Sequence, residues 1–122
     1  MSRQARIESD IVVKNADTLK EAVELTCKEL GAVKIKSIRY YAGKVEAGIK
    51  MGNAEVGIVV DSDGKLSFVG EDYTLNSEAG QKIRQALVKN YKSLSFVNIF
   101  NRMGYKTTLT QGVKNFVMGV RA

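Results

Sequence analysis

The sequence predicts an α+β fold in which a mostly antiparallel sheet has two helices packed on one face. Apolar residues recur at helical spacing near the start of the chain and again in its last third. Between these stretches apolar and polar residues alternate, which is the period of a half-buried strand. The expected order of elements is β-α-β-β-β-α-β, with one further strand possible in the middle.

The chain is expected to begin with a polar arm, a short strand and a helix. We assign residues 1–9 to the arm and residues 10–14 to the strand. Asn15 or Asp17 can cap the helix, because their side-chain oxygens accept hydrogen bonds from first-turn amides. Gly31 ends the helix, since glycine adopts the left-handed conformation at low cost. The apolar residues expected on one face of this helix are Leu19, Ala22, Val23, Cys27 and Leu30.

The middle of the chain is expected to be an antiparallel meander. Gly52-Asn53 suits a two-residue hairpin turn, where a positive φ is needed. Asp61-Ser62-Asp63-Gly64 is expected to turn the chain again. The strands expected here are residues 34–41, 44–51, 54–60 and 65–69.

The last third is expected to hold a second helix and a final strand. The helical region begins at Asn76 or Ser77 and ends at Gly104, and it can be one helix or two. Its apolar stripe comprises Ile83, Ala86, Leu87, Tyr91 and Leu94, continued by Val97, Phe100 and Met103. Phe116, Met118 and Val120 alternate with other residues and are expected to return to the sheet.

Length and composition predict a single soluble domain. A chain of 122 residues can bury a core of its own, and no linker-like stretch divides it. The single cysteine cannot form an internal disulfide, which indicates a reducing compartment. The polar start lacks the apolar region of a secretory signal, and no apolar run approaches the ~20 residues of a membrane span. We therefore expect a cytoplasmic protein with no membrane contact.

The residue types argue against enzymatic and metal chemistry. Histidine is absent, which removes the commonest general base and metal ligand, and we expect no cofactor and no metal. Cys27 lies on the apolar stripe and is expected in the core. Asp61 and Asp63 fit a hairpin turn better than a calcium loop, because lysine occupies the fifth position. An enzyme using Glu71, Asp72 and Lys44 remains a third hypothesis, although no spacing marks them as a unit.

Positive charge is concentrated in the last third of the chain. Residues 79–122 contain eight Lys and Arg and no acid, whereas residues 1–78 contain eleven basic and thirteen acidic residues. Such asymmetry indicates a surface for an anionic partner, although a solvated helix face would also explain it. The candidate binding residues are Lys82, Arg84, Lys89, Lys92, Arg102 and Lys106, with a second cluster of Arg39, Tyr41 and Lys44. Tyrosine rings beside cations could stack on bases.

One segment resembles a known family. Residues 87–105, LVKNYKSLSFVNIFNRMGY, resemble a helix of the uncharacterised plastid and cyanobacterial family called hypothetical chloroplast open reading frame thirty-five. The matching residues are Leu87, Tyr91, Gly104 and Tyr105, and residues 16–31 are similar to the family's first helix. Gly112 followed by Phe116, Met118 and Val120 resembles its final strand. The resemblance implies the same order of elements and an accessory role beside ATPase machinery.

These observations favour a non-enzymatic binding or accessory protein. Its basic last third would contact an anionic partner, either nucleic acid or an acidic protein surface. The alternative is a structural subunit whose sheet edge or apolar face assembles with a larger complex or with itself as a homo-oligomer.

Overall fold

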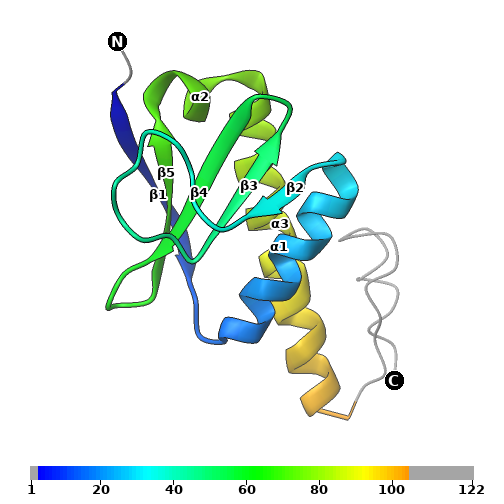
Figure 1. The fold of residues 1–122 in the computed structure, drawn as a ribbon. Helices are drawn as coiled ribbons and strands as arrows, with labels where there is room; N and C mark the ends of the chain where they lie inside the picture. Colours follow the sequence, from blue (N-terminus) through cyan, green and yellow to red (C-terminus); the bar gives the residue numbers. More distant parts are fainter. Residues whose placement is uncertain (1–2, 105–122) are drawn as a thin grey trace.

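A five-stranded antiparallel sheet is the centre of the computed structural model, which describes residues 3–104 (Figure 1). The strands are β1 (Gln4–Val12), β2 (Val33–Ile35), β3 (Ala47–Met51), β4 (Ala54–Val60) and β5 (Lys65–Glu71). The helices are α1 (Ala16–Leu30), α2 (Asp72–Asn76) and α3 (Glu78–Arg102). The strand order is β1-β5-β4-β3-β2, with antiparallel pairing throughout. The predicted α+β class is confirmed, and α1 and α3 lie together on one face of the sheet (Figure 1).

Strand β1 is longer than predicted. Residues 4–9, which we assigned to a polar arm, belong to β1, and residues 4–8 pair with β5, so that assignment is wrong. Burial along β1 alternates with the period of a strand, and Ala5 and Ile7 pack against the main core. The alternation is faint in the sequence because its inward positions include the small residues Ala5 and Ser9.

Helix α1 forms as predicted because its ends are specified locally. The Asn15 Oδ1 atom accepts hydrogen bonds from the amides of Asp17 at 2.9 Å and Thr18 at 3.3 Å. Gly31 closes the helix with φ of 63°. The predicted stripe faces the sheet, where Cys27 is buried, and burial raises the pKa of its thiol.

Helices α1 and α3 are joined by hydrogen bonds as well as by apolar contacts. Asn98 Nδ2 donates to Thr18 Oγ1 at 3.0 Å, and Asn90 Nδ2 donates to Thr26 Oγ1 at 3.0 Å. The partners run in opposite directions along the two helices, as an antiparallel pair requires. Directional bonds between side chains fix the position of one helix along the other more tightly than apolar contact does.

The opposite face of the sheet is covered by the loop of residues 36–46. The strand predicted at residues 34–41 is much shorter in the structure. Only residues 33–35 pair with β3, and the chain then crosses the sheet. Ile38 and Val45 from this loop form a small core with Val59 and Val69. A Cβ atom on Gly57 would lie 2.8 Å from Ile38 Cδ1, so the glycine allows the loop to approach the sheet closely.

The predicted second helical region is one continuous helix, α3, and the short helix α2, which we did not predict, precedes it. Ser77 lies between them, and its Oγ accepts a hydrogen bond from the Gly80 amide at 3.1 Å. This confirms Ser77 as the cap, and it resolves the question of one helix or two in favour of one, up to Arg102. The final strand predicted around Phe116, Met118 and Val120 lies outside the described residues. Among the helices of residues 3–104, none has both the length and the apolarity needed to cross a membrane.

Candidate functional site

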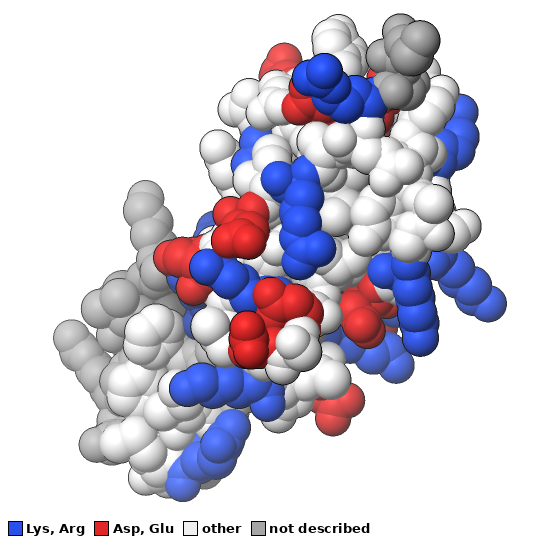
Figure 2. Space-filling model, turned by 90° about the vertical axis from the view of Figure 1, so that its left-hand side faces the viewer, with Lys and Arg blue, Asp and Glu red and all other residues white. Residues whose placement is uncertain are grey.

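Four of the predicted binding cations already have acidic partners. The pairs are Lys82–Glu78 at 3.3 Å, Lys89–Glu29 at 3.4 Å, Lys92–Asp10 at 3.1 Å and Arg39–Glu55 at 2.8 Å. Two lysines of α3 thus reach acids on α1 and β1, which are distant in sequence. Blue and red side chains are interspersed on the side of the molecule seen in Figure 2. The charges of the predicted binding lysines of α3 are therefore largely compensated by neighbouring acids.

Arg84 and Lys106 are two further candidates from the basic last third. Arg84 is half-buried, and its Nε donates to the carbonyl oxygen of Leu75 at 3.1 Å. This bond ties α3 to the preceding helix α2. Lys106 lies outside the described residues.

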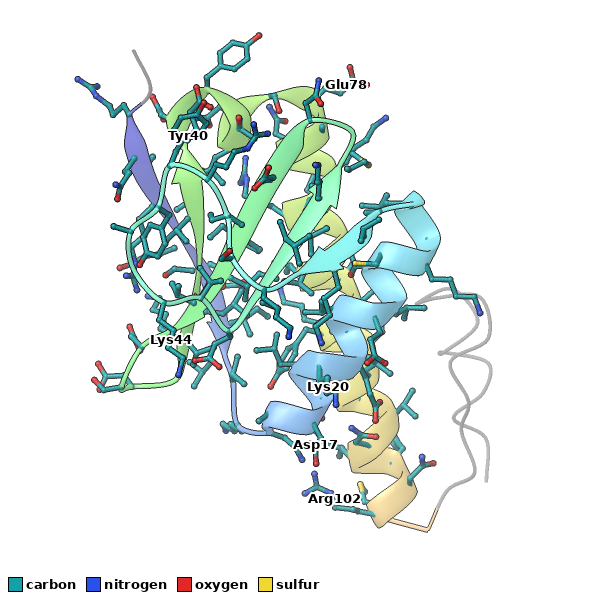
Figure 3. The ribbon with its side chains drawn as sticks, in the orientation of Figure 1. Asp17, Lys20, Tyr40, Lys44, Glu78 and Arg102 are labelled. Atoms are coloured by element: carbon teal, nitrogen blue, oxygen red, sulfur yellow. The ribbon has the colours of Figure 1, made fainter. Side chains whose placement is uncertain are left out.

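The second predicted cluster lies on the other face of the sheet from α3. Arg39, Tyr41 and Lys44 belong to the loop of residues 36–46, and Tyr41 packs against the small core beneath it. Figure 3 shows Tyr40 and Lys44 well separated along this loop, with Arg102 far away at the end of α3. The structure thus does not bring the two predicted clusters together.

Arg39 connects its loop to β4 through two hydrogen bonds to Glu55. Its amide donates to Glu55 Oε1 at 3.1 Å, and its Nε donates to Glu55 Oε2 at 2.8 Å. The Glu55 side chain is only 12% exposed, and burial by itself would raise its pKa. The hydrogen bonds and positive charge of Arg39, with a smaller effect of Lys50, outweigh burial and lower the pKa of Glu55. This bond network anchors the loop to β4.

The residues of the enzyme hypothesis lie apart. Glu71 is at the end of β5, where the antiparallel pairing places it beside the start of β4. Lys44 is near the opposite end of β4, because the amide of the nearby Glu46 donates to the carbonyl oxygen of Ile58. Asp72, next to Glu71, accepts hydrogen bonds from Asn76. No catalytic unit of these three side chains follows from this arrangement.

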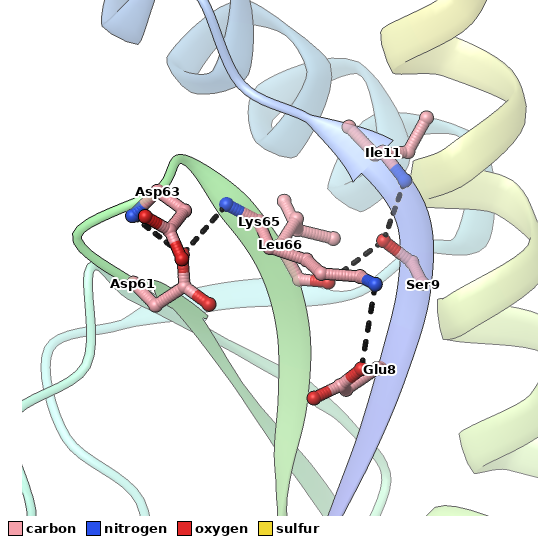
Figure 4. A network of polar contacts seen from close by, with 7 residues as sticks. All are labelled: Glu8, Ser9, Ile11, Asp61, Asp63, Lys65 and Leu66. Atoms are coloured by element: carbon pink, nitrogen blue, oxygen red, sulfur yellow. Dashed lines mark hydrogen bonds and ion pairs between the residues drawn. The ribbon is translucent and has the colours of Figure 1, made fainter.

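The Asp61 side chain organises the β4–β5 turn (Figure 4). Its Oδ1 accepts hydrogen bonds from the amides of Asp63 and Lys65, each at 2.9 Å. The described part of the chain brings no three acidic or cysteine side chains together as a metal cluster. The turn accounts for the Asp61 side chain.

A groove of about 590 Å³ lies between the end of β1, the start of α1 and the last turns of α3. Ile11, Tyr91, Phe96 and Ile99 give it an apolar lining. Phe96 is 52% exposed and Ile99 is 48% exposed, so part of this lining is open to solvent. The Tyr91 hydroxyl accepts a hydrogen bond from the Lys14 amide at 3.2 Å, which joins the β1–α1 connection to α3. The groove therefore rests on three firmly connected elements.

The groove has more positive than negative charge. Lys14, Lys92 and Arg102 line it, whereas Asp10 is its one acid among the described lining residues. The hydrogen bond and charge of Lys92 lower the pKa of Asp10, so these two groups compensate each other. Lys14 and Arg102 form no ion pair within residues 3–104. In the described part of the chain, the groove thus combines two cations that form no ion pair with an apolar lining.

Sequence reasoning named Lys92 and Arg102 but missed Lys14 and Phe96. Lys14 lies in the part of the chain where acids outnumber bases, and Phe96 lies outside the predicted apolar stripe. An exposed aromatic residue off the stripe of an amphipathic helix is a signal that could have marked Phe96. Nothing in the sequence indicates that Lys14 and Arg102 share a groove.

Comparison with known protein families, curated proteins and solved structures gave no match to this chain. The resemblance to the plastid and cyanobacterial family stays a prediction. The function is therefore inferred from the geometry and chemistry of the groove.

Proposed function

We propose that this is a non-enzymatic binding protein that holds a single-stranded nucleic acid in the groove beside Phe96. The observation that carries the proposal is the combination of Lys14 and Arg102, neither of them in an ion pair within residues 3–104, with an exposed aromatic ring. Proteins that bind single strands combine cations for the phosphates with aromatic rings on which bases stack. The acid-free composition of residues 79–122 supports the same choice.

The ion pairs of α3 limit how much the binding depends on salt. A lysine that already contacts a carboxylate has to exchange that partner for a phosphate, so it adds little net electrostatic attraction. Lys14 and Arg102 have no such partner in residues 3–104. With two phosphate contacts on a single strand, log K should fall against log salt with a slope of about −1.4.

Fluorescence anisotropy with a labelled oligothymidylate at low salt tests the proposal. The double variant Lys14→Ala and Arg102→Ala should remove most of the salt dependence. Phe96→Ala should weaken binding by about fivefold or more, since stacking on an aromatic ring is worth roughly 1–3 kcal/mol per base. Lys82→Ala is the matched control, because Lys82 lies at the other end of α3 and pairs with Glu78. The affinity of the Lys82→Ala variant for the oligothymidylate should stay unchanged.

An acidic peptide in the same assay separates nucleic acid from an acidic protein surface. Binding of an acidic peptide would depend on Lys14 and Arg102 but hardly on Phe96, because the peptide has no base to stack. Binding of the peptide alone would replace nucleic acid by an acidic protein as the partner. Binding of neither probe at low salt, or equal losses in the control variant, would refute the proposal.

We further propose that the protein acts in the cytoplasm as an accessory to a larger machine. The use of a single buried cysteine fits a reducing compartment. The family resemblance suggests an ATPase as the neighbour. Affinity capture of the full chain with and without nuclease treatment tests this, because an ATPase held only through nucleic acid would be lost after digestion.

A further inference from the structure

Strand β1 forms an edge of the sheet. Within the described residues, no strand pairs with its outer side. The Asp72 amide donates to the carbonyl oxygen of Arg3 at 2.7 Å, which sets the phase of the β1–β5 ladder. Opposed residues of an antiparallel pair alternate between bonding and non-bonding positions. Ala5 and Ile7 therefore direct their backbone groups toward β5, whereas those of Gln4, Arg6 and Glu8 point outward.

The outward residues of β1 are complementary to a second copy of the same strand. In an antiparallel pair centred on Ile7, Arg6 of each copy lies opposite Glu8 of the other. Centring the pair on Arg6 or on Glu8 instead would place like charges opposite each other, which is destabilising. Arg6 forms no ion pair within residues 3–104, and both side chains are exposed. One register is thus selected by charge.

A second groove accompanies this edge. It has a volume of about 400 Å³ and lies between β1 and α3, and its lining combines the apolar Ile7, Phe68 and Val88 with polar and charged residues. Directly opposed side chains of an antiparallel pair point to the same face of the sheet. Ile7 of the second copy would therefore lie beside the first Ile7 on the helix-covered face, where this groove can receive it.

We propose that two copies of this chain associate through their β1 strands around a two-fold axis at Ile7, joining their sheets into one. The pairing would use backbone hydrogen bonds, two Arg6–Glu8 contacts and the opposed Ile7 side chains. A two-fold interface of this kind closes on itself and does not propagate into a filament. The proposal is independent of the nucleic-acid groove, since Arg6, Ile7 and Glu8 do not line that groove.

A bulge limits the length of the pairing. The β1–β5 register shifts between Glu8 and Val12, and Ser9 spans the irregularity (Figure 4). Its Oγ donates to the carbonyl oxygen of Leu66 at 2.7 Å and accepts from the Ile11 amide at 3.1 Å. Bulges bend the strand and interrupt regular pairing. The stretch before the bulge is therefore the part of β1 available to a second copy, and Ile7 lies within it.

Charge reversal tests the register. Light scattering on the full native chain should give twice the mass of a single chain. Arg6→Glu and Glu8→Arg should each give the mass of one chain. The double variant carrying both reversals should recover the dimer, because each new glutamate then faces a new arginine. Lys20→Glu, an exposed change of the same charge on α1, should leave the dimer intact. Lys65→Ala should also leave it intact, which separates the dimer from loss of the Lys65–Glu8 contact at 3.4 Å.

A crosslinking experiment tests the two-fold axis independently. At a non-bonding antiparallel position the opposed Cα atoms are about 4.5 Å apart, within the roughly 4.4–6.8 Å that a disulfide spans. Ile7→Cys should therefore crosslink two copies under mild oxidation. Arg6→Cys should not, since the two Arg6 residues are offset by two positions along the strands. Circular dichroism confirms that each variant is folded. A native chain that is monomeric at high concentration, or a crosslink through position 6 but not position 7, would overturn the proposal.

Discussion

Replacing Thr26 by valine should destabilise the protein by about 2 kcal/mol, because it leaves a buried amide without its acceptor. Asn90 is 1% exposed and Thr26 is 0% exposed, and the Asn90 Nδ2 atom donates to Thr26 Oγ1 at 3.0 Å. Valine keeps the shape of threonine but accepts no hydrogen bond. Water cannot readily replace the lost partner at such a buried position, so the desolvation cost of the Asn90 amide is no longer offset.

Asn90→Leu should cost less than Thr26→Val. The Thr26 hydroxyl also donates to the carbonyl oxygen of Ala22 at 2.7 Å, so it keeps one hydrogen bond when Asn90 is removed. In the double variant no unpaired amide remains, and its loss of stability should be smaller than the sum of the single losses. We expect a coupling energy of about 1–2 kcal/mol between the two positions.

Urea unfolding followed by circular dichroism measures all four proteins of this double-mutant cycle. The slope against urea should stay the same, so that a change in midpoint reports stability alone. If the losses of stability in the two single variants sum to the loss in the double variant within about 0.3 kcal/mol, the reasoning is refuted. Independent sites add to within that margin. An equal cost for the two single variants would contradict the role given to the Ala22 carbonyl.

Three further variants test the sheet and its loop. Glu55→Gln should lower the melting temperature more near pH 7 than near pH 3. The pKa of Glu55 is lowered in the fold by Arg39, so its stabilisation is present above the unfolded value of about 4.3 and is lost as pH falls through the folded value; equal losses at both pH values would count against this. Gly57→Ala should destabilise by about 1–3 kcal/mol in urea unfolding, because the new methyl group would overlap Ile38. Ser9→Ala should cost about 1 kcal/mol in the same assay, since it removes both hydrogen bonds across the bulge, and an unchanged midpoint would show that the hydroxyl is dispensable.

The elements that the sequence predicts well are those specified by neighbouring residues. Helix α1 has its own cap at Asn15, its own stop at Gly31 and a regular apolar stripe, so both of its ends can be located from the sequence. The turn at Asp61 is equally local, because its hydrogen bonds span at most four residues. In each case the chemistry of a few consecutive residues determines the conformation.

The features that the sequence does not reveal depend on residues far apart in the chain. The Lys89–Glu29 contact joins positions 60 residues apart, and only the packing of α3 on α1 brings them together. The loop of residues 36–46 packs on the far face of the sheet, where Gly57 makes room for Ile38. No local pattern contains that information, and the same limit explains why Lys14 was not linked to the groove.

The ion pairs change what the charge asymmetry of the chain means. The last third is basic, yet Lys89 and Lys92 of α3 lie against acids of α1 and β1, so part of the asymmetry serves to attach α3 to the rest of the protein. A count of charges along the sequence cannot distinguish this role from partner binding. What distinguishes them is position. At the groove, Lys14 and Arg102 have no acidic partner within residues 3–104, and they lie at the end of α3, after which the acid-free residues 105–122 follow in the sequence. A partner that is attracted by the basic last third should therefore be recognised at this end of α3, and substitutions along its paired lysines should affect stability more than binding.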